Sequence, residues 1–502
     1  MDAYDKLAEK WGITVDSSER ESFEEILSGM HAALETIENE PQSEYEILHC
    51  SPRRHTGREM QWEPTAEADP HNAWLCRCDI AGSEEGRLAD LSVGIKDNIA
   101  VSSLPCTAGS AVLSFTPEID ATVVGRLLDA GATVCGKQNM DAFAMGDAGE
   151  LQDFGVTWNP HDRSRLAGGS SSGSAAAVAA GDCDVSIGTD QAGSVRNPAA
   201  WCGIVGCKPT YGLVPYTGIL GMDFGIDHVG VLTGDVRTNA QVLEVIAGED
   251  RQNGVRLDPR QPLQFETESY TRNLDDPIEN LRIGILAEGF DWPKGNAAVE
   301  AVVREQLEEL ADRGISLETV SAPTHDLAVA IIGIVGSLGS ENTYRRGGVG
   351  TTSPGWHWQA AEEAFNQSVQ NRADKLSPAV IASLLFAERC HLNGEESAYA
   401  KAKNIALNLD KEYQSCLDEC DVLAMPTVPY TAIEPAGDQI TQVNRLARLP
   451  VNTAGCNQTG HPALSVPCGT LDGLPVGLQL IGPKFDEGTL YRVGQVIENS
   501  VE

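Results

Sequence analysis

The stretch 168-GGSSSGSAAAVAAGDCDVSIGTDQAGSVRNPAAWCGIVGCKPT-210 determines how we interpret the rest of the chain. Three consecutive serines in a glycine setting lead directly into an Ala/Val run, which predicts that their hydroxyls and amides gather at a helix N-terminus. The following segment, DVSIGT, predicts a strand, and a tight turn of small residues around Gly193 and Ser194 comes next, before Pro198 stops regular structure. Helix, strand and turn therefore alternate within one short segment.

The same alternation continues through most of the chain. Apolar strand candidates such as LSVGIK, LRIGIL, DVLAMP, ALSVPCG and GLPVGLQLIGP are separated by helical segments, among them TVVGRLLDAG, which Gly131 ends, and the stretch from Asn296 to Arg313. This rhythm predicts an α/β fold with a mixed, largely parallel central β-sheet flanked by helices on both faces. We assign residues 66–502 to this α/β domain and expect its mainly helical part, about 320–420, to cap a pocket.

Residues 1–65 differ and are predicted to form an N-terminal helical extension. The segment from Ser22 to Glu38 carries a helical stripe of apolar side chains opposite several glutamates. The stripe consists of Phe23, Ile26, Leu27, Met30, Ala33, Leu34 and Ile37. Either this helix packs on its own main domain, or it is an arm that forms a homodimer through the N-terminal helices; we favour the arm.

Acidic residues dominate the composition. The 502 residues include 73 acidic against 36 basic side chains, which gives a formal net charge of −37, and only eleven residues are lysine. Such a surface suits a halophilic protein in molar salt, where a Debye length of roughly 3 Å screens self-repulsion. An ordinary acidic protein is the alternative. Because phosphate binding needs basic patches, the composition predicts no nucleic-acid partner.

The remaining composition predicts a reduced, cytoplasmic protein. No apolar run reaches the ~18–20 residues that span a bilayer, and the N-terminus is too polar for a signal peptide. Many of the thirteen cysteines lie in apolar stretches, and neither Cys76 and Cys78 nor Cys416 and Cys420 are followed by a second pair at zinc spacing. We therefore expect no membrane contact, no metal and no cofactor.

Two serine clusters are candidates for chemistry. The serines that begin with Ser170 lie where a helix N-terminus stabilises negative charge, although a capping cluster or a flexible linker would have the same composition. The turn around Ser194 can aim several backbone N–H groups at one point, as an oxyanion hole requires. A serine nucleophile also needs a base, and His461 is the nearest histidine candidate, although its apolar loop favours a structural role.

Lysine is the other possible base, provided that burial leaves its amine neutral. Lys96 ends a buried-looking strand, SVGIK, at the kind of position where α/β enzymes place reacting groups. Lys137 and Lys208 also follow apolar segments, so they are its rivals.

Together, three segments resemble the signature of the amidase signature family. They are GIKDNI around Lys96, GGSSSGS beginning with the glycines before Ser170, and GTDQAGSVRNPAAWCGIVGCKPTYG around Ser194. Ser194 follows Ser170 by 24 residues, the spacing expected of the family's two catalytic serines. The resemblance runs from about residue 88 to the end, and within the family the chain looks most like the broad-specificity amidases associated with nitrile hydratase.

The resemblance implies a role for each signature residue. Ser194 would be the nucleophile, Ser170, preceded by a cis peptide bond, would relay the proton, and Lys96, neutral at rest, would be the base. The oxyanion would be held by the backbone amides of Gln191, Ala192, Gly193 and Ser194. The substrate pocket would include Phe143, Met145 and Trp201.

Three residues depart from the family's pattern: Ser172 and Ala192 each replace a glycine, and Ala142 stands where many members carry glutamate. None of them removes a catalytic group. Asp190 and Arg196 are interpreted as an ion pair that braces the nucleophile's turn.

The expected function is hydrolysis of a small carboxylic acid amide to the carboxylate and ammonia, through an acyl-enzyme. The alternatives are a glutamine-hydrolysing subunit of a tRNA-dependent amidotransferase and a catalytically silent binding module on the same fold.

Overall fold

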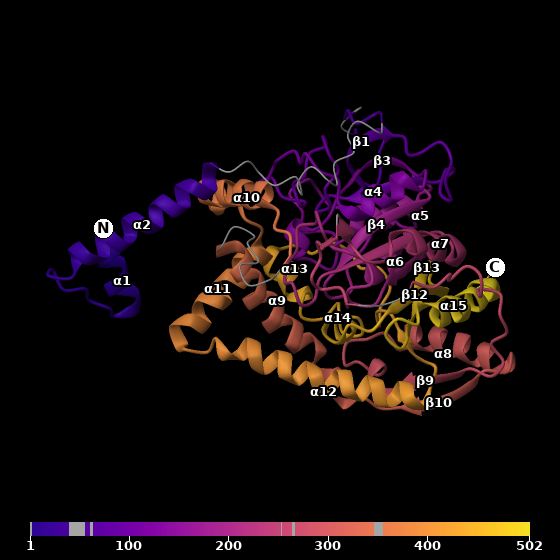
Figure 1. Cartoon of the computed structure of the whole chain (residues 1–502). Helices are drawn as coiled ribbons and strands as arrows, with labels where there is room; N and C mark the ends of the chain where they lie inside the picture. Colours follow the sequence, from indigo (N-terminus) through magenta and orange to yellow (C-terminus); the bar gives the residue numbers. More distant parts are fainter. Residues whose placement is uncertain are drawn as a thin grey trace. The chain divides into compact units, whose positions relative to one another are not determined.

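The computed structural model describes residues 3–39, 56–60, 64–252, 254–263, 267–345 and 355–501 (Figure 1). Two compact units divide the chain, Met1–Ile47 and Leu48–Glu502. The first contains the helices α1 (Ala3–Trp11) and α2 (Arg20–Asn39), so the helix expected over Ser22–Glu38 is confirmed.

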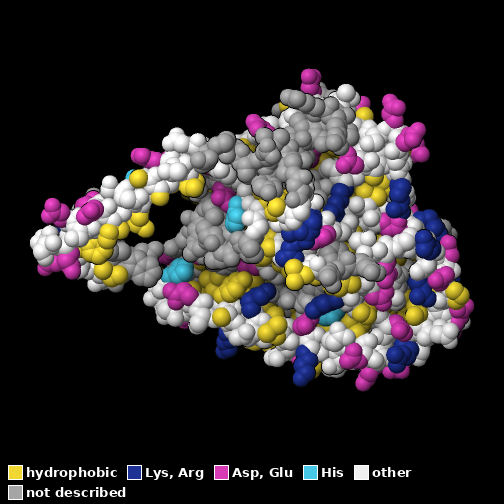
Figure 2. Space-filling view, in the orientation of Figure 1, with side chains coloured by type: hydrophobic (Ala, Val, Ile, Leu, Met, Phe, Trp, Pro, Cys, Tyr) yellow, Lys and Arg dark blue, Asp and Glu magenta, His cyan; other side chains and the backbone are white. Residues whose placement is uncertain are grey.

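Helix α2 buries none of its residues. Its apolar stripe faces solvent, with Met30 64 % and Ile37 71 % exposed, and hydrophobic side chains line this helix in Figure 2.

The second unit is built on an eleven-stranded sheet with the order β1-β3-β2-β4-β6-β5-β12-β13-β11-β9-β10. Its strands are β1 (Trp74–Ile80), β2 (Ser92–Lys96), β3 (Thr133–Gln138), β4 (Val185–Asp190), β5 (Val205–Lys208), β6 (His228–Thr233), β9 (Arg282–Leu286), β10 (Ser316–Val320), β11 (Val422–Pro426), β12 (Ala463–Leu471) and β13 (Leu474–Ile481). The two short strands β7 (Arg251–Gln252) and β8 (Val255–Arg256) pair separately.

The sheet is mixed, as predicted, but its parallel pairs form two separate groups on either side of an antiparallel centre, and the edge strand β1 also pairs antiparallel with β3. Strand β2 pairs in parallel with β3 and β4, and β9 pairs in parallel with β10 and β11. Between them, β4, β6, β5, β12, β13 and β11 are joined by antiparallel pairs. The parallel share is therefore smaller than expected, because apolar strand patterns do not encode the direction of pairing.

Helices flank this sheet (Figure 1). They are α4 (Thr122–Asp129), α5 (Ser172–Ala179), α6 (Arg196–Cys202), α7 (Val236–Ile246), α8 (Ala297–Asp312) and α15 (Glu487–Val501). The short helices α13 (Gln439–Arg445) and α14 (Ala454–Thr459) pack against other helices of this unit. Helix α5 is made of Gly, Ser, Ala and Val and is buried almost throughout. Its small side chains allow close approach: a Cβ added at Gly173 would lie 2.2 Å from the carbonyl oxygen of Ala73.

The region expected to be mainly helical contains α9 (Ala328–Arg345), α10 (Gln359–Arg372), α11 (Pro378–Asn393) and α12 (Ser397–Glu419). Among the described residues, no helix is long and apolar enough to cross a membrane, and no group of three or more His, Cys, Asp or Glu side chains is arranged to hold a metal ion.

Candidate active site

Lys96 lies at the end of β2, wholly buried between β3 and β4. Its Nζ is 2.8 Å from Oγ of Ser170, 2.9 Å from Oγ1 of Thr189 and 3.1 Å from the carbonyl oxygen of Thr189. All three partners are uncharged. Burial lowers the pKa of Lys96 to about 7, although the carboxylates of Asp190 and Asp141 oppose this shift. A neutral amine is therefore well populated near neutral pH, as a lysine base requires.

The peptide bond between Gly169 and Ser170 is cis, as the resemblance implied. The N–H of Gly169 donates to the carbonyl oxygen of Asp147 at 3.0 Å, and a Cβ at Gly169 would lie 2.0 Å from Oδ2 of Asp141. The next amide, that of Ser171, donates to the carbonyl oxygen of Ser194 at 3.1 Å. The backbone thus holds the Gly169–Ser171 segment directly against the residue expected to be the nucleophile.

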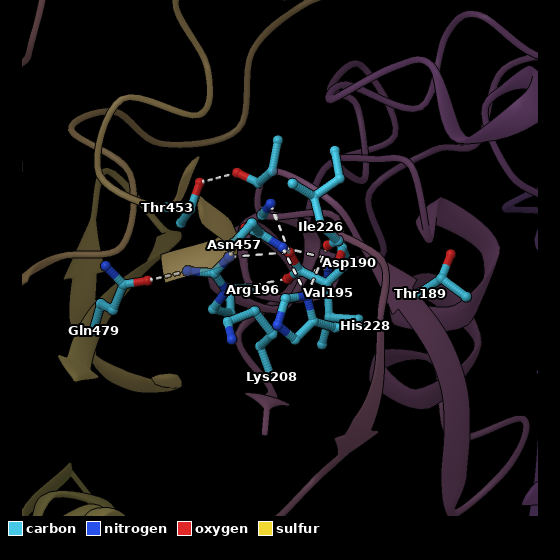
Figure 3. Close-up of polar contacts among 12 residues, drawn as sticks. Thr189, Asp190, Val195, Arg196, Lys208, Ile226, His228, Thr453, Asn457 and Gln479 are labelled. Atoms are coloured by element: carbon cyan, nitrogen blue, oxygen red, sulfur yellow. Dashed lines mark hydrogen bonds and ion pairs between the residues drawn. The ribbon is translucent and has the colours of Figure 1, made fainter. Parts of the chain in front are cut away.

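Ser194 follows β4 in a turn that the buried carboxylate of Asp190 organises. Figure 3 shows this carboxylate with its partners Arg196 and Asn457. Asp190 accepts hydrogen bonds from the N–H of Gly193 at 2.8 Å and of Val195 at 3.1 Å. Arg196 donates to the same carboxylate through Nε and Nη2, at 3.0 and 2.9 Å. Burial alone would raise the pKa of Asp190, but Arg196 outweighs burial and holds it below the usual range. The ion pair predicted to brace this turn is confirmed.

Residues near the C-terminus complete the brace. Nδ2 of Asn457, on α14, donates to the carbonyl and to Oδ1 of Asp190, both at 2.9 Å, and its Oδ1 accepts from Nη2 of Arg196 at 2.8 Å. Nη1 of Arg196 donates to Oε1 of Gln479, on β13, at 2.8 Å. The hydroxyl of Thr453 donates to the carbonyl oxygen of Ala192 at 2.6 Å.

The four amides expected to form the oxyanion hole are not equivalent. The N–H of Gly193 donates to Asp190, whereas those of Gln191, Ala192 and Ser194 donate to no acceptor in the described part of the chain. Gly193 has φ 135°, and Ala192 is not among the residues with positive φ. The alanine that replaces a glycine at 192 is therefore accommodated without strain at φ.

A cavity of about 200 Å³ is connected to this turn through the side chain of Gln191, although Lys96, Ser170 and Ser194 are not among the residues that line it. Its walls include Asn98, Phe143, Leu220, Met222, Trp356, Trp358 and Phe365, together with Tyr216 and Asp227. The last two accept hydrogen bonds from Nε2 of Gln191, each at 3.0 Å, and so connect the cavity to the oxyanion turn. Burial raises the pKa of Asp227 to about 7.

Of the three predicted pocket residues, only Phe143 lines this cavity. Met145 packs beside it in the cluster that contains Phe365. Trp201 is 1 % exposed, lies in a separate apolar cluster, and donates its indole N–H to the carbonyl oxygen of Tyr430.

The rival bases lie in other environments. His461 contacts Oγ1 of Thr459 at 2.9 Å, and burial lowers its pKa to about 3. Lys137 is 3.2 Å from Oδ1 of Asp97. Lys208 donates to the carbonyl oxygen of Pro209 at 3.0 Å, and burial lowers its pKa to about 8. Among the contacts of the described residues, none joins these three side chains to Ser170 or Ser194.

Sequence reasoning missed two groups beside Lys96. Oγ1 of Thr189 accepts from Lys96 and also from Nδ2 of Asn98 at 3.2 Å, so both side chains orient the amine. Their positions inside GIKDNI and GTDQAGS were the available signal, since both motifs lie at the ends of neighbouring strands.

Comparisons with known proteins agree with this geometry. The sequence profile of the Amidase family matches residues 67–491. The chain is 40 % identical to a glutamyl-tRNA(Gln) amidotransferase subunit of Chloroflexus aggregans, and the match covers 82 % of each chain. It is 37 % identical to the protein of the same name from Natronomonas pharaonis, and that match covers 85 % of this chain and 99 % of the relative.

Solved structures give the same result. The structure of the glutamyl-tRNA(Gln) amidotransferase subunit of the same name from Thermotoga maritima superposes with a TM-score of 0.72 at 30 % identity and covers 86 % of this chain and 88 % of that one. A structure described as an amidase has a TM-score of 0.66 at 28 % identity and covers 83 % and 86 %.

These relatives correct our expectation about partners. A homodimer that acts on a small amide, without any link to nucleic acid, was expected. The relatives are instead named as subunits of an amidotransferase for glutamyl-tRNA(Gln). The net charge of one chain is a poor guide to whether a complex binds nucleic acid, because other subunits of a complex can make the contacts with the RNA. The match over residues 67–491, with the shared fold, shows that the chain belongs to the amidase signature family of amide-hydrolysing enzymes.

Proposed function

We propose that this chain hydrolyses the side-chain amide of glutamine and releases ammonia, as the glutaminase-type subunit of a tRNA-dependent amidotransferase. The similarity to proteins named as subunits of glutamyl-tRNA(Gln) amidotransferase, at 37–40 % identity over more than four-fifths of the chain, carries this proposal. It supports glutaminase activity better than the general amidase that the sequence suggested.

The proposed chemistry starts at Lys96. The neutral amine draws a proton from Ser170, which in turn takes the proton of Ser194 as the Ser194 oxygen attacks the amide carbon. The 2.8 Å contact between Lys96 and Ser170 supports the first of these transfers. The amide oxygen becomes an oxyanion, for which the N–H groups of Gln191, Ala192 and Ser194 are the available donors.

Collapse of the tetrahedral intermediate breaks the C–N bond. The proton returns through Ser170 to the nitrogen, and ammonia leaves, so that an ester remains on Ser194. A water molecule, deprotonated by the same relay, then hydrolyses the ester, which yields glutamate and the free serine. The sum is glutamine and water converted to glutamate and ammonia.

The test is ammonia release by the purified chain from glutamine, pentanamide and benzamide, with Ser194→Ala as control. We expect a kcat/KM for glutamine at least tenfold above that for pentanamide, and no turnover above background in Ser194→Ala. A preference for the two apolar amides would overturn the proposal in favour of a general amidase, whose substrates the aromatic walls of the cavity would suit. Retention of activity by Ser194→Ala would remove Ser194 from its role.

A further inference from the structure

Asp147 is a buried carboxylate that the mechanism does not use. It follows the short 3-10 helix η1 (Ala142–Ala144) and is only 7 % exposed. Its side chain has no hydrogen bond or ion pair with any described residue. The carboxylate oxygens are nevertheless not fully enclosed, so a small part of their surface stays accessible. Buried polar groups are usually paired, so the missing partner is informative.

Nearby carboxylates show what Asp147 lacks. Asp141 accepts the N–H groups of Gly149 at 3.0 Å and Leu151 at 2.7 Å. Asp190 accepts two amides and the guanidinium of Arg196. Both carboxylates are therefore structural, whereas Asp147 is left without a partner of either kind among the described residues.

The position of Asp147 connects it to the reaction centre. Its carbonyl oxygen accepts the N–H of Gly169 at 3.0 Å, so it is paired to the residue before Ser170. Its neighbour Ala148 packs in the same cluster as Val428, with Tyr430 against that cluster. Burial raises the pKa of Asp147 well above its usual value, the charges of Asp141 and Asp190 add to this, and Lys96 opposes it. The surroundings therefore favour the neutral form of this carboxyl, and a cation placed beside it would stabilise the carboxylate.

We infer that Asp147 is a specificity-determining residue, which receives an ammonium group carried on the acyl part of the substrate. For the proposed glutamine substrate this group is the α-ammonium, and that identification rests on the proposed function. The preference for a cationic over a neutral acyl chain does not rest on it. An ammonium offers three N–H donors to a carboxylate that has no other partner, and the pair forms only when substrate is bound.

The test compares substrates that differ in a single ammonium group. One pair is glutamine and glutaramate, the same amide without its amino group; the other is 5-aminopentanamide and pentanamide. The ratio of kcat/KM within each pair is measured for the wild-type chain, for Asp147→Asn, and for the control Asp153→Asn. Asp153 is an exposed carboxylate that accepts hydrogen bonds from Ser110 and Ala111, so this control makes the same chemical change at the surface.

We expect the wild type to favour the ammonium-bearing member of a pair by roughly 10- to 100-fold, as a buried charged hydrogen bond allows. Asp147→Asn should reduce the ratio to near 1, and Asp153→Asn should leave it at the wild-type value. The same comparison in Ser194→Ala, read as Kd for glutamine and glutaramate with and without Asp147→Asn, separates binding from turnover.

The outcomes separate the two proposals. If glutamine is not hydrolysed but 5-aminopentanamide is preferred through Asp147, the glutaminase function fails and the ammonium site stands. A ratio that Asp147→Asn leaves unchanged in both kinetics and binding overturns the inference. So does a wild type that does not distinguish the members of either pair.

Discussion

Two lysines on neighbouring strands are equally buried, yet the pKa of one is lowered and the pKa of the other is raised. Lys96 on β2 and Lys137 on β3 are both wholly buried, in strands paired so that Ile95 is opposite Lys137. For Lys137, burial pulls the pKa down, but Asp97 at 3.2 Å outweighs it and the pKa is raised. For Lys96, whose close partners are hydroxyls and a carbonyl, burial prevails and lowers the pKa to about 7.

The difference teaches that burial alone does not make a lysine a base. Both amines lose water, and the nearest partner then decides which protonation state is stabilised. A carboxylate keeps Lys137 charged as a structural cation. Hydroxyls solvate either form of Lys96, and one of them can pass it a proton.

The largest expected effect on activity follows from removing the amine of Lys96, whose close partners are hydroxyls and a carbonyl. Lys96→Met should lower kcat by about 10³-fold, within the range expected for loss of a general base, because no other basic side chain contacts Ser170 in the described part of the chain. Unfolding by urea should show a protein at least as stable as the wild type, since a costly buried amine has been replaced by an apolar chain of similar length. Activity within tenfold of the wild type would show that Lys96 is not the base.

Removing the other lysine should affect the fold. Lys137→Met leaves the Asp97 carboxylate buried without its partner, which should lower the free energy of unfolding by about 3–5 kcal/mol. The double variant Lys137→Met/Asp97→Asn should recover part of this loss, and urea unfolding at pH 7 measures both. Equal stability of the single variant and the wild type would mean that the pair does not hold this region together.

A third variant places a carboxylate near Lys96, as Asp97 already lies near Lys137. The base form of Lys96 exists above its pKa, so kcat should rise with pH through about 7 and then level off. Asn98→Asp adds a carboxylate next to Thr189, stabilises the protonated amine, and should move this rise about 1 pH unit to the alkaline side. Asn98→Ala, which adds no charge, should leave its midpoint in place. A profile that is flat from pH 6 to 9 in the wild type would contradict a titrating lysine.

The smallest effect concerns salt. If the surface is adapted to molar salt, as we propose from the net charge of −37, raising salt from about 0.1 to 1 M shortens the Debye length from about 10 to 3 Å. The field of distant carboxylates is then screened, so the midpoint for Lys96 should fall by a few tenths of a pH unit and the thermal midpoint should rise. The Lys137–Asp97 contact is too short to be screened. Full stability in dilute buffer would contradict the halophilic proposal.

How far the sequence could be interpreted depends on the range of the interactions concerned. The resemblance to the amidase signature family predicted the Lys96–Ser170 contact and the cis bond before Ser170, and the opposite charges that flank Ser194 predicted the Asp190–Arg196 pair. The alternating pattern predicted strands and helices but not the antiparallel centre of the sheet, because pairing direction depends on connections far away in sequence. The position of Trp201 in the sequence did not reveal its surroundings, and in the structure its indole N–H donates to the carbonyl oxygen of Tyr430 in the interior.

The nucleophile's turn and Arg196 depend on hydrogen bonds with Thr453, Asn457 and Gln479, of which the first two donate and Gln479 accepts, and this has a consequence for biosynthesis. The serine and lysine motifs emerge early from the ribosome, but the turn that carries Ser194 lacks its supports until the last segment has been translated. A truncated nascent chain would therefore contain every reacting group and still be inert, so that hydrolysis begins only with the finished polypeptide.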